Sequence, residues 1–371
     1  MNKEQLYQEH LDLMFGTTTL ENLSESIVDD IITRIIDFLP NNGKLYKYRS
    51  IESESFDYAY DGLKNGYLYM ARANTLNDDF DSTLNFDAEK DANKQMELFL
   101  EKPWLYLEAL VRENCKQRQI FSSPYDKKAY QMLMSCVNNE SYELDREKAI
   151  NVFSQIGIDR QTSENYINKV LETVENEIRN NAEDLKKPLS ALINFNNESR
   201  KDIYIFSMSE AYDSDTMWAY YANSNKGFCV EYDYDKVKDL PFKKKLLISL
   251  YKVVYKDNFD EYSFSDMLQY YLGGKKDDKL LKRANMQTLT CMITKLSRWK
   301  EEKEWRIFLF NLDEKNKIFA DIVSGLILDE RIMNSENGIK LLNLAKEKNW
   351  SVTIRKRTRI GTGHLYEEYS T

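Results

Sequence analysis

Histidine is nearly absent from this chain of 371 residues, which has only His10 and His364, near opposite ends of the sequence. A zinc site built from histidines needs several of them close together. A serine or cysteine nucleophile usually depends on a histidine as its base. The sequence therefore argues against a histidine-rich metal site and a histidine-based triad, and no metal cofactor is expected.

Cysteine is scarce as well. The four cysteines, Cys115, Cys136, Cys229 and Cys291, are far apart and match no metal-binding or disulfide spacing. The N-terminus is polar and becomes acidic within its first ten residues, which is wrong for a secretory signal. Together these features predict a reduced, cytoplasmic protein.

Long apolar runs are also missing. No stretch of about 18 uncharged apolar residues is present, so we expect no transmembrane helix and no membrane partner. Hydrophobic residues nevertheless make up 42% of the chain, which is close to the globular average. A well-formed hydrophobic core is therefore expected, and bulk disorder is not.

Tyrosine is abundant, and charge is unevenly distributed. The 25 tyrosines bring the aromatic share to 13%, and tyrosine suits half-buried clefts because its ring is apolar and its hydroxyl polar. Residues 1–100 hold 9 Lys and Arg against 19 Asp and Glu, whereas residues 241–371 hold 25 against 18. The basic C-terminal part could face a phosphate-bearing partner, or it could dock against the acidic N-terminal part.

The apolar periodicity predicts an α+β fold with a mixed or antiparallel sheet. Strands are expected at residues 45–49, 67–71, 203–207, 227–232, 250–255, 304–311, 322–328 and 350–354. Helices are expected at 4–15, 20–38, 51–64, 261–298 and 336–348, with about five more between 88 and 197, the longest near 162–182. We therefore expect a helical N-terminal extension (1–43), an α+β core (44–87 and 202–371) and an all-helical insertion (88–201).

Five short segments carry side chains that core packing alone does not require. They are Lys47-Tyr48-Arg49, Asn77-Asp78-Asp79-Phe80-Asp81, Ser207-Met208-Ser209, Met217-Trp218-Ala219-Tyr220-Tyr221, and the group Trp299, Glu302, Glu304, Trp305 and Arg306. The first places an arginine at the end of a strand, the third ends a strand with two hydroxyls, and the last interleaves tryptophans with charge.

Together these segments resemble the bacterial family known as domain of unknown function 2971. That family shows a Lys-Tyr-Arg start, an Asn-Asp-Pro-Phe-Glu/Asp loop, Met-Trp-x-His-Tyr-Ala before Lys/Arg-Gly, and then Lys, Trp and Glu-x-Glu-Trp-Arg. The similarity covers about residues 44–310. Asp79 stands where proline is usual and Tyr220 where histidine is usual, so no role of that histidine carries over. The resemblance implies that the segments meet in space.

The motif order is also similar to the Arg–Ser–Glu arrangement of ADP-ribosyltransferases. That resemblance implies that Arg49 holds the phosphates of NAD through its planar fork, while Ser207 and Ser209 brace the site. It also implies that Glu304 bonds a ribose hydroxyl and stabilises the cationic sugar, and that Glu302 positions the acceptor. Nucleotide-binding roles, stacking among them, are expected for Tyr48, Asn77, Asp78, Phe80, Asp81, Trp218, Tyr221, Trp299, Trp305 and Arg306.

The preferred expectation is a transferase or glycohydrolase that uses NAD as a substrate, with a protein or nucleic acid as the candidate acceptor. A chain of this type without a metabolic signature would fit a conditional effector, such as a toxin or an antiphage defence protein. Two alternatives remain open. One is a phosphodiesterase in which Asp78, Asp79, Asp81, Glu302 and Glu304 bind Mg²⁺ and the basic part binds nucleic acid. The other is a non-catalytic module that binds a nucleotide or a protein.

A purely structural interpretation also stands beside these alternatives. Arg49 would then pair with Glu304 or Asp81, and a buried ion pair of that kind is not by itself a gain in stability. Trp218 and Trp305 would be core anchors.

Overall fold

The computed structural model describes residues 37–52, 54–78, 81–83, 85, 87–112, 124–138, 141–180, 200–240, 249–262, 289–310, 316–358 and 363–369. The chain divides into two compact units, the first formed by Met1–Thr83, Asn197–Asp260 and Leu289–Thr371, the second by Leu84–Asn196 and Glu261–Thr288. The helix expected at 4–15 and nearly all of that at 20–38 lie outside the described residues. No helix in the described part is long and apolar enough to cross a membrane.

The first unit is built on a mixed sheet of nine strands, which confirms the α+β class. The strands are β1 (Lys44–Arg49), β3 (Ala71–Arg72), β4 (Ile203–Ser209), β5 (Phe228–Asp233), β6 (Leu250–Lys252), β9 (Glu304–Phe310), β11 (Val323–Asp329), β12 (Ser351–Arg357) and β13 (His364–Glu368). Their order is β13-β12-β11-β5-β1-β4-β9-β6, with β3 beside β4. All neighbours are antiparallel except β11 and β12, which are parallel.

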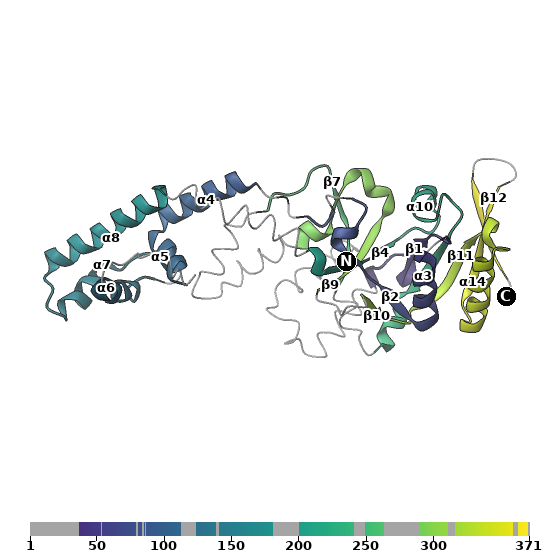
Figure 1. Ribbon diagram of the computed structural model, residues 1–371, viewed down its shortest axis with the longest axis horizontal. Helices are drawn as coiled ribbons and strands as arrows, with labels where there is room; N and C mark the ends of the chain where they lie inside the picture. The colour runs from purple at the N-terminus through teal and green to yellow at the C-terminus, as the bar shows by residue number, and fades with distance from the viewer. Residues whose placement is uncertain are drawn as a thin grey trace. The chain divides into compact units, whose positions relative to one another are not determined.

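The parallel pair needs a crossover connection, and helix α14 (Glu336–Lys348) supplies it. The Ser335 side chain caps its first turn, and Asn349 ends it in the left-handed conformation. In Figure 1, α14 runs alongside β11 and β12, which it contacts. The expected helix at 336–348 therefore has the predicted bounds.

The two faces of the sheet carry different clusters. One face packs against α3 (Glu54–Asn65) and α14, and its core includes Leu45, Val230, Leu326 and Ile354. The other face carries a smaller cluster around Trp218, covered by α10 (Asp215–Tyr221). Because neighbouring residues of a strand point to opposite faces, β1, β5 and β11 contribute to both clusters.

Two small two-stranded sheets and the C-terminal strand β13 differ from the sequence-based expectations. The pair β2 (Tyr67–Tyr69) and β10 (Lys317–Phe319) is antiparallel, and the pair β7 (Val254–Lys256) and β8 (Thr294–Leu296) is parallel. Residues 263–288 of the helix expected over 261–298 lie outside the described part. Its C-terminal end is wrong, because pairing with β7 stabilises a strand at 294–296 against the local helical spacing. Strand β13 was not expected, since its edge position leaves most of it exposed and without a marked apolar pattern.

The described part of the second unit contains five α-helices, in agreement with the helical texture of its sequence. They are α4 (Ala88–Glu101), α5 (Pro103–Arg112), α6 (Pro124–Met134), α7 (Arg146–Ser154) and α8 (Arg160–Asn180). Asp87 and Asp145 cap the N-termini of α4 and α7 through their carboxylates. The unit has a core of its own, in which α8 buries Ile167, Val174 and Ile178.

Candidate functional site

A pocket lies where the neighbouring strands β1 and β4 separate from each other. Strand β1 pairs with β4 at one position only, Tyr46 opposite Ser209, and farther along β4 the neighbour is β3, at Ile205 and Tyr204. The pocket has a volume of about 190 Å³ accessible to water-sized molecules. Its walls include the predicted site residues Tyr48, Arg49, Asn77, Asp81, Ser207, Ser209, Tyr221, Glu302 and Glu304.

The parting of the strands lets side chains from both sheet faces reach this pocket. Strand pairing places Tyr46, Ser209 and Glu304 on one row across β1, β4 and β9. Alternation along β1 puts Lys47 and Arg49 on the opposite face, yet both line the pocket. The site is thus assembled by the sheet topology rather than by one loop.

Lys47 bridges the gap between the strands. Its Nζ donates a hydrogen bond of 2.5 Å to the Ser207 carbonyl oxygen and lies 4.4 Å from the centre of the Phe206 ring. Burial, and then the nearby charge of Arg49, hold the pKa of Lys47 well below its ordinary value. Lys47 was not among the predicted site residues, although it belongs to the Lys-Tyr-Arg segment.

Arg49 is the second cation at this wall. Its guanidinium forms no hydrogen bond and no ion pair with any residue that the structure describes, and the expected pairing with Glu304 or Asp81 is not formed. Burial lowers the pKa of Arg49. A partly buried guanidinium without an anionic partner in the described part of the chain is suited to bind an anionic ligand.

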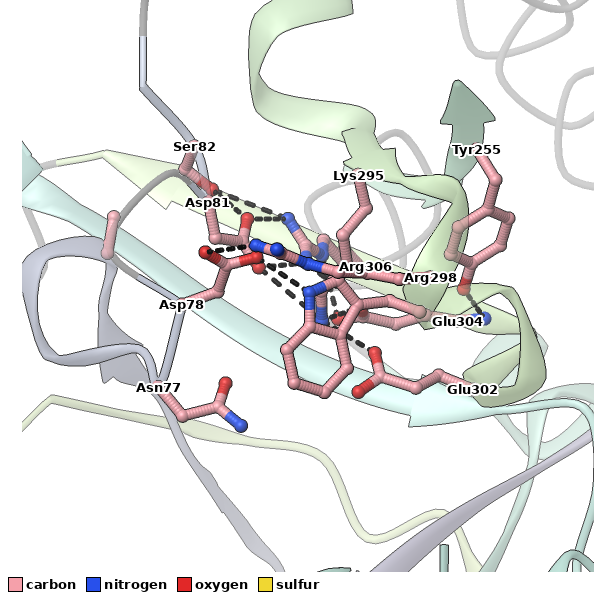
Figure 2. A network of polar contacts seen from close by, with 12 residues as sticks. Asn77, Asp78, Asp81, Ser82, Tyr255, Lys295, Arg298, Glu302, Glu304 and Arg306 are labelled. Carbon is pink, nitrogen blue, oxygen red and sulfur yellow. Dashed lines mark hydrogen bonds and ion pairs between the residues drawn. The ribbon is translucent and has the colours of Figure 1, made fainter. Parts of the chain in front are cut away.

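Arg306 takes the partner role that the structural interpretation gave to Arg49 (Figure 2). Its Nη1 and Nη2 donate to the Asp81 carboxylate at 2.6 Å each. Its Nε and Nη2 donate to the Glu304 carboxylate at 2.7 and 2.9 Å. Arg306 is fully buried. Its contacts with Asp81 and with Glu304 are both bidentate, which is the geometry of strong ion pairs.

Lys295 joins Glu304 to a second buried glutamate. Its Nζ lies 2.5 Å from Glu302, 3.2 Å from Glu304 and 3.6 Å from Asp81. Burial alone would raise the pKa of Glu304, but the charges of Arg306 and Lys295 hold it well below its ordinary value. The two cations therefore favour the ionised form of Glu304.

Glu302 has the opposite shift. Burial, and then the negative charge of Glu304, raise its pKa. The Tyr221 hydroxyl donates to Glu302 at 2.6 Å and accepts from Asn77 Nδ2 at 3.0 Å. Two neighbouring carboxyl groups whose pKa values are pushed apart are the arrangement in which one can exchange protons while the other stays charged.

The loop before the second unit is fixed to this network by Asp78. Trp299 Nε1 donates to Asp78 at 2.8 Å. Arg298, which Figure 2 labels with Asp78, lies 3.8 Å from the same carboxylate. Trp299 therefore holds the loop rather than lining the pocket. Asp79 and Phe80, from the same segment, lie outside the described residues.

The other two tryptophans predicted for the site lie in the cores. Trp305 follows Glu304 on β9 and so points to the opposite face, where it stacks on Phe38 with ring centres 5.8 Å apart. Trp218 is fully buried, with the Arg355 guanidinium 4.7 Å from its ring centre. Both occupy the positions of core anchors.

Two further network residues were missed by the sequence analysis. Lys295 corresponds to the lysine that precedes the tryptophan in the family pattern, which is the signal that could have identified it. Tyr255 accepts a hydrogen bond of 2.9 Å from the Glu304 backbone N–H, and nothing local in the sequence predicts that contact.

The carboxylates that meet here are already paired with cations. Asp81, Glu302 and Glu304 share the charges of Lys295 and Arg306. Within the described ranges, no group of three or more His, Cys, Asp and Glu side chains is arranged to hold a metal ion. The magnesium-dependent alternative therefore gains no support from these residues.

Comparisons with known proteins bear on the same segment. Neither the curated proteins nor the solved structures gave a match. A family model matches residues 217–307, which include Tyr221, Lys295, Glu302, Glu304 and Arg306. This match agrees with the resemblance of the motifs, since the model is described as "Protein of unknown function (DUF2971)".

Proposed function

We propose that the pocket between β1 and β4 binds NAD, and that the protein transfers ADP-ribose from NAD or hydrolyses it. One observation carries this proposal. Arg49, Ser207 and the pair Glu302 and Glu304 come from segments far apart in sequence, yet they line one pocket. A pocket of about 190 Å³ is smaller than those that enclose a whole drug-sized ligand, so it fits the nicotinamide ribose end, with the rest of NAD extending outward.

The cationic wall supports binding of the diphosphate. Arg49 has no anionic partner among the described residues, and Lys47 beside it has no ion pair there either. A guanidinium binds phosphate oxygens through two parallel hydrogen bonds, and an ammonium adds a point charge. Burial, and then the charge of Arg49, lower the pKa of Lys47, and an anion bound at this wall would offset the repulsion between the two cations.

The acidic wall supports the chemistry at the ribose. As the bond between C1′ and the nicotinamide nitrogen breaks, its electron pair leaves with neutral nicotinamide and the sugar becomes cationic. Ionised Glu304 stabilises that charge. Its oxygens already accept from Arg306, Lys295 and Ser207, so its contribution is electrostatic. Glu302, with its raised pKa, contacts the reacting group and takes the proton from the attacking water or acceptor.

The test is incubation of the purified protein with NAD, with and without cell lysate, while nicotinamide release is followed by mass spectrometry. Glu302→Gln should reduce release by about 100-fold or more, because it removes the proton acceptor. Glu301→Gln is the matched control, since Glu301 is the exposed neighbour of Glu302. Absence of release in the wild type, together with no rise in melting temperature on adding NAD, would overturn the proposal.

A further inference from the structure

A second pocket lies on the same sheet as the first but involves other strands. Strand pairing aligns Tyr46, Glu231, Gly325 and Ser351 in one row across β1, β5, β11 and β12. The pocket above this row has a volume of about 310 Å³ accessible to water-sized molecules. Among the described lining residues, it shares only Tyr46 with the pocket between β1 and β4. It is therefore a site separate from the one proposed to bind NAD.

Gly325 keeps the floor of this second pocket open. A Cβ atom added there would lie 2.3 Å from Ser351 Oγ and 3.5 Å from Glu231 Oε1. The first distance is impossible without movement of Ser351, and the second would place the new atom in van der Waals contact with the Glu231 carboxylate. Glycine at this position therefore leaves the carboxylate accessible from the pocket.

Three tyrosine rings form its walls. The ring centres of Tyr46 and Tyr212 are 5.2 Å apart, and those of Tyr212 and Tyr366 are 5.1 Å apart. Tyr212 and Tyr366 are half-buried, so their rings are partly accessible. Electron-rich aromatic faces beside a carboxylate attract cations.

Negative charge dominates the lining. Glu231 and Glu368 contribute two carboxylates, and Lys44 is the one cation among the described lining residues. Lys44 and Ser324 both bind Glu231 Oε1, at 2.7 and 2.6 Å. Glu231 Oε2 receives only a long hydrogen bond of 3.4 Å from Tyr46, so within the described part of the chain it has capacity for another donor.

The surroundings reinforce this negative potential. Burial, followed by the charge of Glu231, raises the pKa of Tyr46. Burial also raises the pKa of Tyr366 to about 12, with Asp213 and Asp215 adding to the rise and Arg355 opposing it. The Arg355 charge is already matched by Asp329 at 3.0 Å and Asp215 at 2.8 Å.

We infer that this second pocket binds a primary alkylammonium group, held by Glu231 and the faces of Tyr212 and Tyr366. The same chemistry is offered by a free diamine and by the side chain of a lysine in a peptide. This site does not depend on NAD being the ligand of the first pocket.

The experiment is isothermal titration of the full chain with putrescine and with Nα-acetyl-lysinamide, and with 1,4-butanediol as a neutral match for putrescine. Saturable binding of at least one amine, and none of the diol, is expected. Binding of putrescine alone would identify a free diamine as the source, and binding of the lysine derivative would identify a peptide. No saturable binding of either amine, or equal binding of the diol, would overturn the inference.

Variants separate a binding role from a folding role. Glu231→Gln and Tyr212→Leu should each weaken amine binding about tenfold or more, whereas Tyr212→Phe keeps the ring and should bind within about threefold of the wild type. Glu367→Gln is the charge-matched control, because Glu367 is exposed on β13, between the lining residues Tyr366 and Glu368, and pairs with Lys356. Unchanged affinity in both Glu231→Gln and Tyr212→Leu would also overturn the inference. If Glu231→Gln does not fold, the amine affinity of Tyr212→Leu alone tests the inference.

Discussion

Arg306 donates two hydrogen bonds of 2.6 Å to the carboxylate of Asp81, although 225 residues separate them in the sequence. The same guanidinium also binds Glu304, so it ties the loop before the second unit to strand β9. This pairing places Asp81 at the wall of the pocket, beside Glu302 and Glu304. The candidate site therefore depends on Arg306 for its shape as well as its charge balance.

Replacement of Arg306 should be strongly destabilising. Arg306→Met would leave the Asp81 and Glu304 carboxylates buried with Lys295 as their remaining cation. Removing one partner of a buried ion pair typically costs about 3–5 kcal/mol in the free energy of unfolding. Urea denaturation measures this cost. Arg298→Met is the control, because Arg298 is 59% exposed and 3.8 Å from Asp78, and it should cost no more than about 1 kcal/mol. Similar losses in both variants would contradict the assigned role.

The depressed pKa of Glu304 predicts a loss of stability in acid. A carboxyl group whose pKa is lower in the folded than in the unfolded state stabilises the fold above its unfolded pKa. That contribution decreases once the pH falls below about 4.3, the ordinary value for glutamate. The free energy of unfolding should therefore fall less steeply between pH 5 and pH 3 in Glu304→Gln than in the wild type. Glu347→Gln, on the outer helix α14, should retain the wild-type slope. Equal slopes in all three proteins would show that Glu304 is not held ionised.

The sequence predicts the strands better than it predicts which side chains meet. Strands β4, β5, β9 and β11 follow apolar patterns that are visible in the chain, because burial on a sheet imposes those patterns. The placement of Trp305 was also predictable, since alternation puts it on the face opposite its neighbours Glu304 and Arg306. The separation of β1 from β4 was not, because strand pairing over long distances depends on the whole sheet. Lys47 and Arg49 reach the pocket only through that separation.

Loss of the Tyr221 hydroxyl should change the pH dependence of the reaction. Burial and the charge of Glu304 raise the pKa of Glu302, and the hydrogen bond from Tyr221 opposes that rise. In Tyr221→Phe the pKa of Glu302 should rise further. Because Glu302 accepts the proton in its ionised form, the acidic limb of the pH profile of nicotinamide release should move to higher pH. The rate near neutral pH should fall about tenfold, the effect of losing about one hydrogen bond.

Tyr220→Phe is the matched control for that experiment. Tyr220 is 71% exposed and precedes Tyr221 on α10, so loss of its hydroxyl should leave both the rate and the profile unchanged. A Tyr221→Phe profile that falls in amplitude without moving along the pH axis would argue that Tyr221 only supports packing.

Replacement of Arg49 tests whether this side chain serves ligand binding or the stability of the fold. A side chain that serves the fold loses stability when it is removed, whereas a partly buried charge without a partner disfavours the folded state. Arg49 has no hydrogen bond or ion pair with the described residues, and burial lowers its pKa. Arg49→Met keeps most of the apolar stem, so the free energy of unfolding without ligand should stay within about 1 kcal/mol of the wild type or increase. The rise in melting temperature with NAD should disappear in the same variant. Arg49→Lys should retain part of that rise, because it preserves the charge but not the fork that matches a phosphate. A destabilised Arg49→Met that still responds to NAD would mean that Arg49 is a structural residue and that the phosphates bind elsewhere.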